Sequence, residues 1–364
     1  MAAPVVLCIV FLLLDQHAAA NVGAARAGVR ASVNGDLELT PAQGQRVLLN
    51  GTDVLTELGL LRRQATAQQT AIAALALSLQ RAESLVASTI HEGGARLYAI
   101  GIDTYRPTET PRATEVYDGE NWQPAPPMLT PRFIFAAAVF RDLVHAVGGA
   151  KAGGLPLRTT EQFDGFIWKA GPQMLGPRVH HAAVVYRDFL YAIGGQGQFS
   201  LHLSSVERFD GVAWKAVNDM AEKRTGLAAA VYRRHLYAIG GANSATVERF
   251  DGSDWHTAPS LPQPRYGSSA IVHAGKLLVC GGATLTPVNS VFAFDGAVWS
   301  HFPPMIVGRA ALSTAVYHAT LHALGGTTDM EPTNSVEAYD PVEGKWRAES
   351  ATFFPRQWGG AVVY

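Results

Sequence analysis

The sequence has little of what marks a disulfide scaffold or a nucleic-acid-binding protein. Only two of the 364 residues are cysteine, 16% are charged, and the formal net charge is −1 at neutral pH. A charge this close to zero provides no general basic field that would attract nucleic acid or an anionic membrane. Because two cysteines cannot form a disulfide framework, the fold must depend on its apolar core.

Long apolar runs are also absent, apart from a short one near the N-terminus. Residues 5–14 form a ten-residue apolar stretch, which is too short to span a bilayer and is typical of a signal peptide. Small residues at 18–20 follow, as at a cleavage site. We therefore predict a signal peptide over residues 1–20 and a secreted chain without a stable membrane span. An uncleaved N-terminal anchor is the alternative.

Cleavage would remove Cys8 and leave Cys280 as the remaining cysteine. Cys280 lies in the stretch KLLVCGG, and similar stretches elsewhere in the chain carry Ile or Val at its position. We expect a buried small hydrophobic residue there, not a nucleophile. Asn50 begins an Asn-Gly-Thr sequon, which makes it a candidate glycosylation site if the chain enters a eukaryotic secretory pathway.

From residue 95 onward the chain repeats itself about every 45 residues. Tryptophans recur at steps of 46, 46, 41, 44 and 47 residues, an arginine follows each by ten residues, and a Gly-Gly doublet follows each of the first five arginines by sixteen. Offsets that stay fixed through five cycles indicate a structural repeat. The tryptophans are Trp122, Trp168, Trp214, Trp255, Trp299 and Trp346. The doublets are Gly148 and Gly149, Gly194 and Gly195, Gly240 and Gly241, Gly281 and Gly282, and Gly325 and Gly326.

Each cycle predicts four short antiparallel strands. The first is apolar, as in residues 226–232, and the second ends in the glycine doublet, as in 236–241. The third alternates, as in 246–251, and the fourth begins at the tryptophan after an Asp-Gly turn. Four antiparallel strands repeated at this length predict the blade of an all-β propeller.

The repeat resembles the kelch motif in its arginine, its Gly-Gly doublet and its Tyr or Phe and Trp at fixed offsets. The resemblance covers residues 95–364 and implies a kelch-type β-propeller of the galactose-oxidase-like superfamily, with six motifs. This region opens with a second strand (95–102) and ends with a first strand (355–364). We therefore predict six blades closed by the C-terminal strand, which leaves no unpaired edge.

The segment before the propeller has a different pattern. Residues 21–53 are Ala/Gly-rich and polar, with a short strand expected in RVLLNG. Residues 54–90 are predicted to form an amphipathic helix or coiled coil, because apolar and small residues recur there in alternating steps of three and four. A coiled coil over 54–89 would produce a homo-oligomer with avidity for a repeated target. A single helix packed on the propeller is the alternative.

No catalytic constellation is found in the sequence. The stretch GGQGQFSL lacks the glycine spacing of a dinucleotide-binding loop, and neither a P-loop nor a nucleophile elbow is present. The histidine doublet His180-His181 has no evident third metal ligand. We therefore predict no cofactor, no metal and no enzymatic activity. An enzyme similar to kelch-type sugar mutarotases or galactose oxidase is the alternative, although no catalytic carboxylate can be assigned.

The repeated residues are expected to be structural. Each tryptophan should pack between neighbouring blades. A glutamate on the third strand should pair with the arginine of its own blade, as Glu248 with Arg224, whereas the fifth blade has Phe292 there and leaves Arg265 without this partner. These glutamates are Glu115, Glu161, Glu207, Glu248 and Glu337.

Function is expected where the repeats differ. The distance from the first doublet glycine, or its counterpart Gly101, to the third-strand position of the glutamate is 14, 13, 13, 8, 11 and 12 residues. Strand parity places these links and the fourth-to-first-strand connections on one face, where the kelch resemblance implies peptide binding. We predict a secreted module that binds a protein or peptide partner, with a carbohydrate-binding or sugar-active propeller as the alternative. The candidate contact residues are Tyr105, Arg106, Lys151, Arg158, Phe199 and His202.

Overall fold

The computed structural model describes residues 94–101, 112–151, 153–329 and 331–364, together with a few short stretches before residue 69. The chain divides into two compact units, Met1–Ser88 and Thr89–Tyr364. In the first unit, β1 (Gly28–Ala31) pairs with β2 (Leu37–Thr40), and β3 (Leu48–Leu49) pairs with β4 (Thr52–Asp53). The hairpin of β1 and β2 was not predicted, although the stretch VRASVNGDLELT alternates apolar and polar residues around an Asn-Gly pair, which is a hairpin signal.

Most of the predictions for the N-terminal segment lie outside the described residues. This applies to the signal peptide, to the glycosylation site at Asn50 and to most of the predicted coiled coil, of which Leu60, Arg63, Gln64, Thr66 and Gln68 are helical. In the described part of the chain, no helix is both long and apolar enough to cross a membrane.

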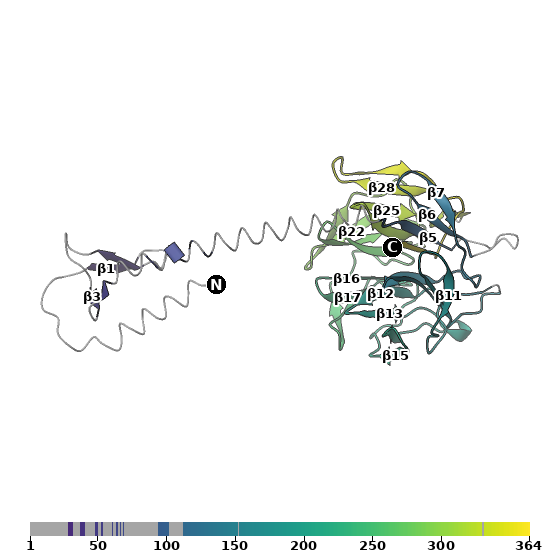
Figure 1. The fold of residues 1–364 in the computed structure, drawn as a ribbon, viewed down its shortest axis with the longest axis horizontal. Coiled ribbons are helices and arrows are strands. Elements are labelled where there is room, and N and C mark those ends of the chain that lie inside the picture. The colour runs from purple at the N-terminus through teal and green to yellow at the C-terminus, as the bar shows by residue number, and fades with distance from the viewer. Residues whose placement is uncertain are drawn as a thin grey trace. The chain divides into compact units, whose positions relative to one another are not determined.

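The second unit contains six four-stranded antiparallel sheets, which are the six predicted blades (Figure 1). The first blade contains β30 (Gly360–Val363), β5 (Leu97–Ile100), β6 (Thr114–Tyr117) and β7 (Trp122–Ala125). The second contains β8 (Ala136–Phe140), β9 (Leu143–Val147), β10 (Thr160–Phe163) and β11 (Trp168–Gly171). The third contains β12 (Ala182–Tyr186), β13 (Phe189–Ile193), β14 (Val206–Phe209) and β15 (Trp214–Val217).

The remaining three blades repeat this order of strands. The fourth contains β16 (Ala228–Tyr232), β17 (His235–Ile239), β18 (Val247–Phe250) and β19 (Trp255–Ala258). The fifth contains β20 (Ser269–His273), β21 (Lys276–Cys280), β22 (Val291–Phe294) and β23 (Trp299–Phe302). The sixth contains β24 (Ser313–Tyr317), β25 (Thr320–Leu324), β28 (Val336–Asp340) and β29 (Lys345–Glu349), with the hairpin β26 (Thr327–Thr328) and β27 (Glu331–Pro332) inserted. A single 3-10 turn, η1 (Gln198–Ser200), lies in the β13–β14 link.

The C-terminal strand closes the propeller as predicted. Strand β30 pairs antiparallel with β5, so that Gly360 lies opposite Ile100 and Val363 lies opposite Leu97. The first blade is therefore built from both ends of the repeat region. This pairing covers the edge that β5 would otherwise present to another chain.

The core lies between blades, and the second strand of each blade is its most buried part. In β17, Leu236, Ala238 and Ile239 are completely buried. Cys280 occupies the corresponding position in β21 and is also completely buried, and burial raises the pKa of its thiol to about 12. The expectation of a buried hydrophobic residue at this position is therefore confirmed.

Each repeated tryptophan ties its blade to the preceding one. Its indole N–H donates to a backbone carbonyl just after the fourth strand of that blade, as from Trp168 to Pro126 at 2.9 Å and from Trp214 to Pro172 at 3.0 Å. All six tryptophans make this bond, at 2.8–3.0 Å. The predicted role between neighbouring blades is confirmed.

The predicted arginine–glutamate pairs are also present, and both side chains make further hydrogen bonds with the backbone. In the fourth blade, Arg224 Nη2 lies 3.0 Å from Glu248 Oε1, while Nη1 donates to the carbonyl oxygens of Gly240 and Thr246 at 2.8 and 2.9 Å. The same carboxylate accepts backbone N–H bonds from Ala221 and Glu222. One buried pair therefore fixes the glycine doublet, the third strand and the connection that enters the blade.

The glycine doublet leaves no room for a side chain. Gly240 has φ +62°, and a Cβ there would lie 2.8 Å from the carbonyl oxygen of Arg265 in the next blade. Gly194 has φ +59°, and its Cβ would lie 2.7 Å from the carbonyl oxygen of Arg224. Both the left-handed backbone and the close approach of the next blade therefore require glycine.

In the fifth blade, the glutamate of the pair and one of its hydrogen-bond donors are both replaced. Phe292 replaces the glutamate, and Arg265 lies over its ring at 4.8 Å and donates to Ser290 Oγ at 2.5 Å. Pro262 stands three residues before Arg265, where the other five blades have a residue whose N–H donates to the glutamate. Proline has no N–H to donate. The carboxylate and one of its donors are therefore both absent from the same blade.

The substitution Glu337→Ala should lower the free energy of unfolding by about 3–5 kcal/mol, because it leaves the buried Arg309 guanidinium without its counter-ion. Denaturant unfolding measures this loss. Glu343→Ala removes an exposed carboxylate and should change stability by less than about 0.5 kcal/mol. Equal unfolding midpoints for the two variants would contradict a structural role for the pair.

Candidate functional site

The links between second and third strands and the connections between fourth and first strands lie on one face, which we call the loop face. Second and fourth strands both end there, because all neighbouring strands in a blade are antiparallel. Two hollows on this face carry the chemistry of interest. We call the first the interblade groove, and the second the channel-side pocket.

Of the six candidate contact residues, the four that the structure describes do not line one hollow. Tyr105 and Arg106 lie outside the described residues, and Lys151 is an exposed residue of the β9–β10 link. Arg158 lines the interblade groove, and His202 lines the channel-side pocket. Phe199, in η1, is 91% exposed.

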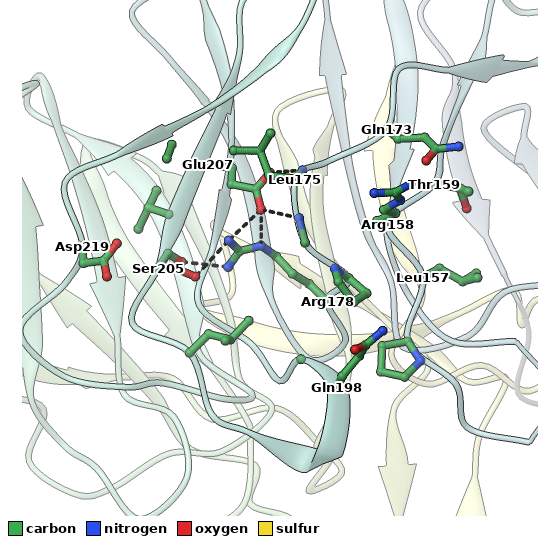
Figure 2. Close-up of a pocket in the computed structure, with 17 residues that line it drawn as sticks. Leu157, Arg158, Thr159, Gln173, Leu175, Arg178, Gln198, Ser205, Glu207 and Asp219 are labelled. Atoms are coloured by element: carbon green, nitrogen blue, oxygen red, sulfur yellow. Dashed lines mark hydrogen bonds and ion pairs between the residues drawn. The ribbon is translucent and has the colours of Figure 1, made fainter.

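The interblade groove lies between the second and third blades and encloses about 880 Å³. Its lining comes from three stretches of the chain, within residues 156–159, 173–178 and 197–207, together with Ala216 and Asp219. Figure 2 shows the Arg178–Glu207 pair between the two sides of the groove. The distance between Arg178 Nη2 and Glu207 Oε1 is 2.9 Å.

The same pair also fixes one wall of the groove. Glu207 accepts the backbone N–H groups of Leu175 and Gly176 at 2.7 and 3.1 Å. These bonds hold the β11–β12 connection against the third blade. The structural repeat thereby determines where the groove lies.

The rims of the groove carry polar side chains that are free to bind. Those of Arg158, Gln173, Gln198 and Asp219 are exposed and make no hydrogen bond or ion pair with any residue that the structure describes. Between them lie apolar side chains, including Leu175, which is 56% exposed. The groove therefore offers an apolar surface bordered by unpaired donors and acceptors.

A belt of left-handed residues surrounds the centre of the propeller. The second residue after each repeated arginine has φ between +50° and +64°. From the third blade onward, each N–H in this series donates to the carbonyl of its counterpart in the preceding blade, at 2.6–3.4 Å. The series is Ile134, His180, Gly226, Gly267, Ala311 and Trp358. Four non-glycine residues accept a backbone conformation that costs free energy.

Three rings from different blades meet beside this belt. The ring centroids of His180 and Trp358 are 4.4 Å apart, and those of Tyr266 and Trp358 are 5.3 Å apart. The hydroxyl of Tyr266 lies 3.4 Å from His180 Nδ1. Burial, with a smaller contribution from the charge of His202, lowers the pKa of His180 to about 4, so its imidazole is neutral at pH 7.

The channel-side pocket adjoins this ring cluster through Tyr266 and encloses about 470 Å³. Thr225, His202 and Asn243 also line it. The buried hydroxyl of Thr225 has no hydrogen-bond partner among the described residues. Sequence reasoning missed the contribution of Tyr266 and Trp358. Tyr266 follows its repeated arginine by one residue and Trp358 follows its own by two. The residue type at both positions varies from blade to blade, and this variation is the sequence signal that could have identified them.

The two side chains of the histidine doublet lie in different surroundings. Whereas His180 joins the ring cluster, His181 is 6% exposed and packs against the glycine doublets of the second and third blades. Neither ring nitrogen of His181 has a partner in the described structure, and burial lowers its pKa to about 3. Among the described residues, no group of three or more His, Cys, Asp or Glu could hold a metal ion.

Comparison with known proteins agrees with the architecture. The family model of the Kelch motif matches residues 177–220 and 309–350, which are the third and sixth blades. The chain is a kelch-repeat propeller. The other four blades of the kelch propeller have the same arrangement of arginine, glycine and tryptophan.

A solved structure titled "Structure of YjhT" is similar to this kelch propeller. It has a TM-score of 0.57 and 13% sequence identity, and the match covers 66% of this chain and 91% of the other. At this identity the similarity shows the fold alone. A search of curated proteins found no match.

His181 should make the kelch propeller sensitive to acid. Its pKa is about 3 in the folded state and near 6.5 in the unfolded chain, so below pH 6.5 the unfolded state binds a proton that the folded state does not. Its contribution to stability is complete above about pH 6.5 and decreases toward pH 3, by up to about 1.4 kcal/mol per pH unit.

The variant His181→Leu tests this, because Leu227 and Leu312 occupy the corresponding positions in other blades. Its unfolding free energy should fall less steeply than that of the wild type between pH 6.5 and pH 4. Denaturant unfolding at several pH values measures both slopes. Identical slopes would show that His181 is not the titrating group.

Proposed function

We propose that this kelch propeller is a binding module that recognises a polypeptide segment through its loop face. The observation that supports this most strongly is the interblade groove. It combines a volume of about 880 Å³ with an apolar surface and exposed, unpaired polar side chains on its rims. A peptide bound there would bury apolar side chains and find partners for its backbone groups.

Exposed apolar residues near the groove support the same proposal. Phe199 and Leu201 follow the groove residue Gln198 in the β13–β14 link, and both are largely exposed. Large apolar side chains exposed on loops are frequent contact points for protein partners. The rigid blades beneath them hold these loops in place.

Secretion and oligomer formation belong to this proposal as well. The apolar run at residues 5–14 supports secretion, and the periodicity of residues 54–89 supports a homo-oligomer. An extracellular oligomer would present several loop faces together. Avidity would then strengthen binding to a repeated partner.

A library of random peptides displayed on phage and selected on the secreted protein tests the proposal. Selected peptides should bind the wild type and Val212→Asp with equal affinity, because Val212 lies in a turn on the opposite face. They should bind Ala216→Trp at least about tenfold more weakly, because the indole would fill one end of the groove. Melting temperatures close to that of the wild type confirm that both variants fold.

Peptides that bind all three proteins equally would contradict the proposal. A second candidate function would then gain support, namely carbohydrate binding at the channel-side pocket. The ring cluster of His180, Tyr266 and Trp358 favours it, because aromatic faces beside a few polar groups suit small ligands. A glycan array that retains a sugar on the wild type but not on Trp358→Ala would identify this function.

A further inference from the structure

The interblade groove has unpaired charges of opposite sign at its two sides. Arg158 lies on the second-blade side, in the β9–β10 link, and Asp219 lies on the third-blade side, just after β15. Figure 2 shows the two side chains well separated, with Arg178 and Glu207 between them. Neither Arg158 nor Asp219 is paired with another described residue, and both are exposed.

Arg178 and Glu207, which lie between these two residues, cannot bind the charged groups of a ligand, because their hydrogen bonds are made within the protein. Arg178 directs Nη1 to the carbonyl oxygens of Gly194 and Ser205, Nη2 to Ser205 Oγ and Glu207, and Nε to Glu207. All five guanidinium N–H groups therefore have acceptors. Glu207 is also occupied by two backbone N–H groups. A ligand must find its charged partners at the rims.

The space between the rims is suited to an uncharged, mainly apolar stretch. Leu157, Leu175 and Leu203 line it from the three segments of the groove. The free amides of Gln173 and Gln198 can each donate to and accept from a peptide backbone. This combination suits an extended polypeptide better than a nucleic acid or an anionic membrane, whose phosphates Asp219 would repel.

We propose that the groove selects an extended peptide with an acidic side chain at Arg158, a basic side chain at Asp219 and apolar residues between them. This inference rests on the proposed peptide-binding function and specifies the chemistry of the partner. Exposed charge pairs contribute little affinity, but they strongly determine which partner and which orientation are favoured. The groove thereby fixes the direction in which the peptide lies.

The charge-reversal variants Arg158→Glu and Asp219→Lys test the inference with the same displayed random peptides. Peptides selected on the wild type should carry one acidic and one basic residue flanking an apolar stretch. Their affinity should fall roughly three- to tenfold in each variant, and this difference should shrink in 1 M salt, where the screening length is about 3 Å. Selection on the double variant should favour peptides with the two charges in reverse order.

Two matched controls change the net charge equally on the opposite face. Lys276→Glu lies at the β20–β21 turn and Glu343→Lys at the β28–β29 turn, and both should bind as the wild type does. Selected peptides without the charge pattern, or equal effects of Arg158→Glu and Lys276→Glu, would overturn this inference and leave the groove as a peptide site. Selected peptides whose binding is unchanged in Ala216→Trp would overturn both.

Discussion

A buried pair of one arginine and one glutamate determines where the loop face of this propeller lies. In five of the six blades the pair joins the connection before the first strand to the third strand, and its carboxylate also accepts two N–H groups from that connection. Removing either partner would leave a charge buried without compensation, which is among the larger penalties a single substitution can cause. The position of the interblade groove follows directly, because Glu207 holds the β11–β12 connection that forms one wall.

In the fifth blade, the glutamate of the pair and one of the residues that donate to it are replaced together. Where Phe292 replaces the glutamate, Pro262 replaces one of the residues that would have donated to it, and the arginine rests on the phenylalanine ring instead. A glutamate in that blade would lack one of its usual donors, and a free N–H at position 262 would lack its acceptor. The two replacements are therefore consistent with each other, and the blade keeps its four strands.

Much of the fold could be predicted because repetition reveals it. The constant offsets between Trp, Arg and Gly-Gly reflect recurring hydrogen bonds: the tryptophan bond is made in all six blades, and the bond from the arginine to the first glycine of the doublet, or to Gly101, is made in five. The closure by β30 followed from the strand order at the two ends of the repeat region. The Arg224–Glu248 pair could be expected because both residues recur in register. The hairpin of β1 and β2 lies outside the repeat and was missed, although the Asn-Gly pair between two alternating stretches in VRASVNGDLELT is a local hairpin signal.

The candidate sites were less accessible from sequence, because they are formed by residues that do not repeat. Variation in loop length led to Arg158 and His202, but it could not show that the two line different hollows. Trp358 lies 178 residues after His180, and only the circular closure brings their rings together. Asp219 follows a fourth strand and looks like an ordinary turn residue until the groove between two blades is seen.

The most direct test of this account is native-state hydrogen exchange of the backbone amides of Leu175 and Gly176. In the wild type both amides should be protected, because they donate to the buried carboxylate of Glu207. In Glu207→Gln, which can accept fewer hydrogen bonds, both should exchange faster, while amides of β17 in the next blade keep their protection. Unchanged exchange at both positions would contradict the claim that the buried pair holds the wall of the groove.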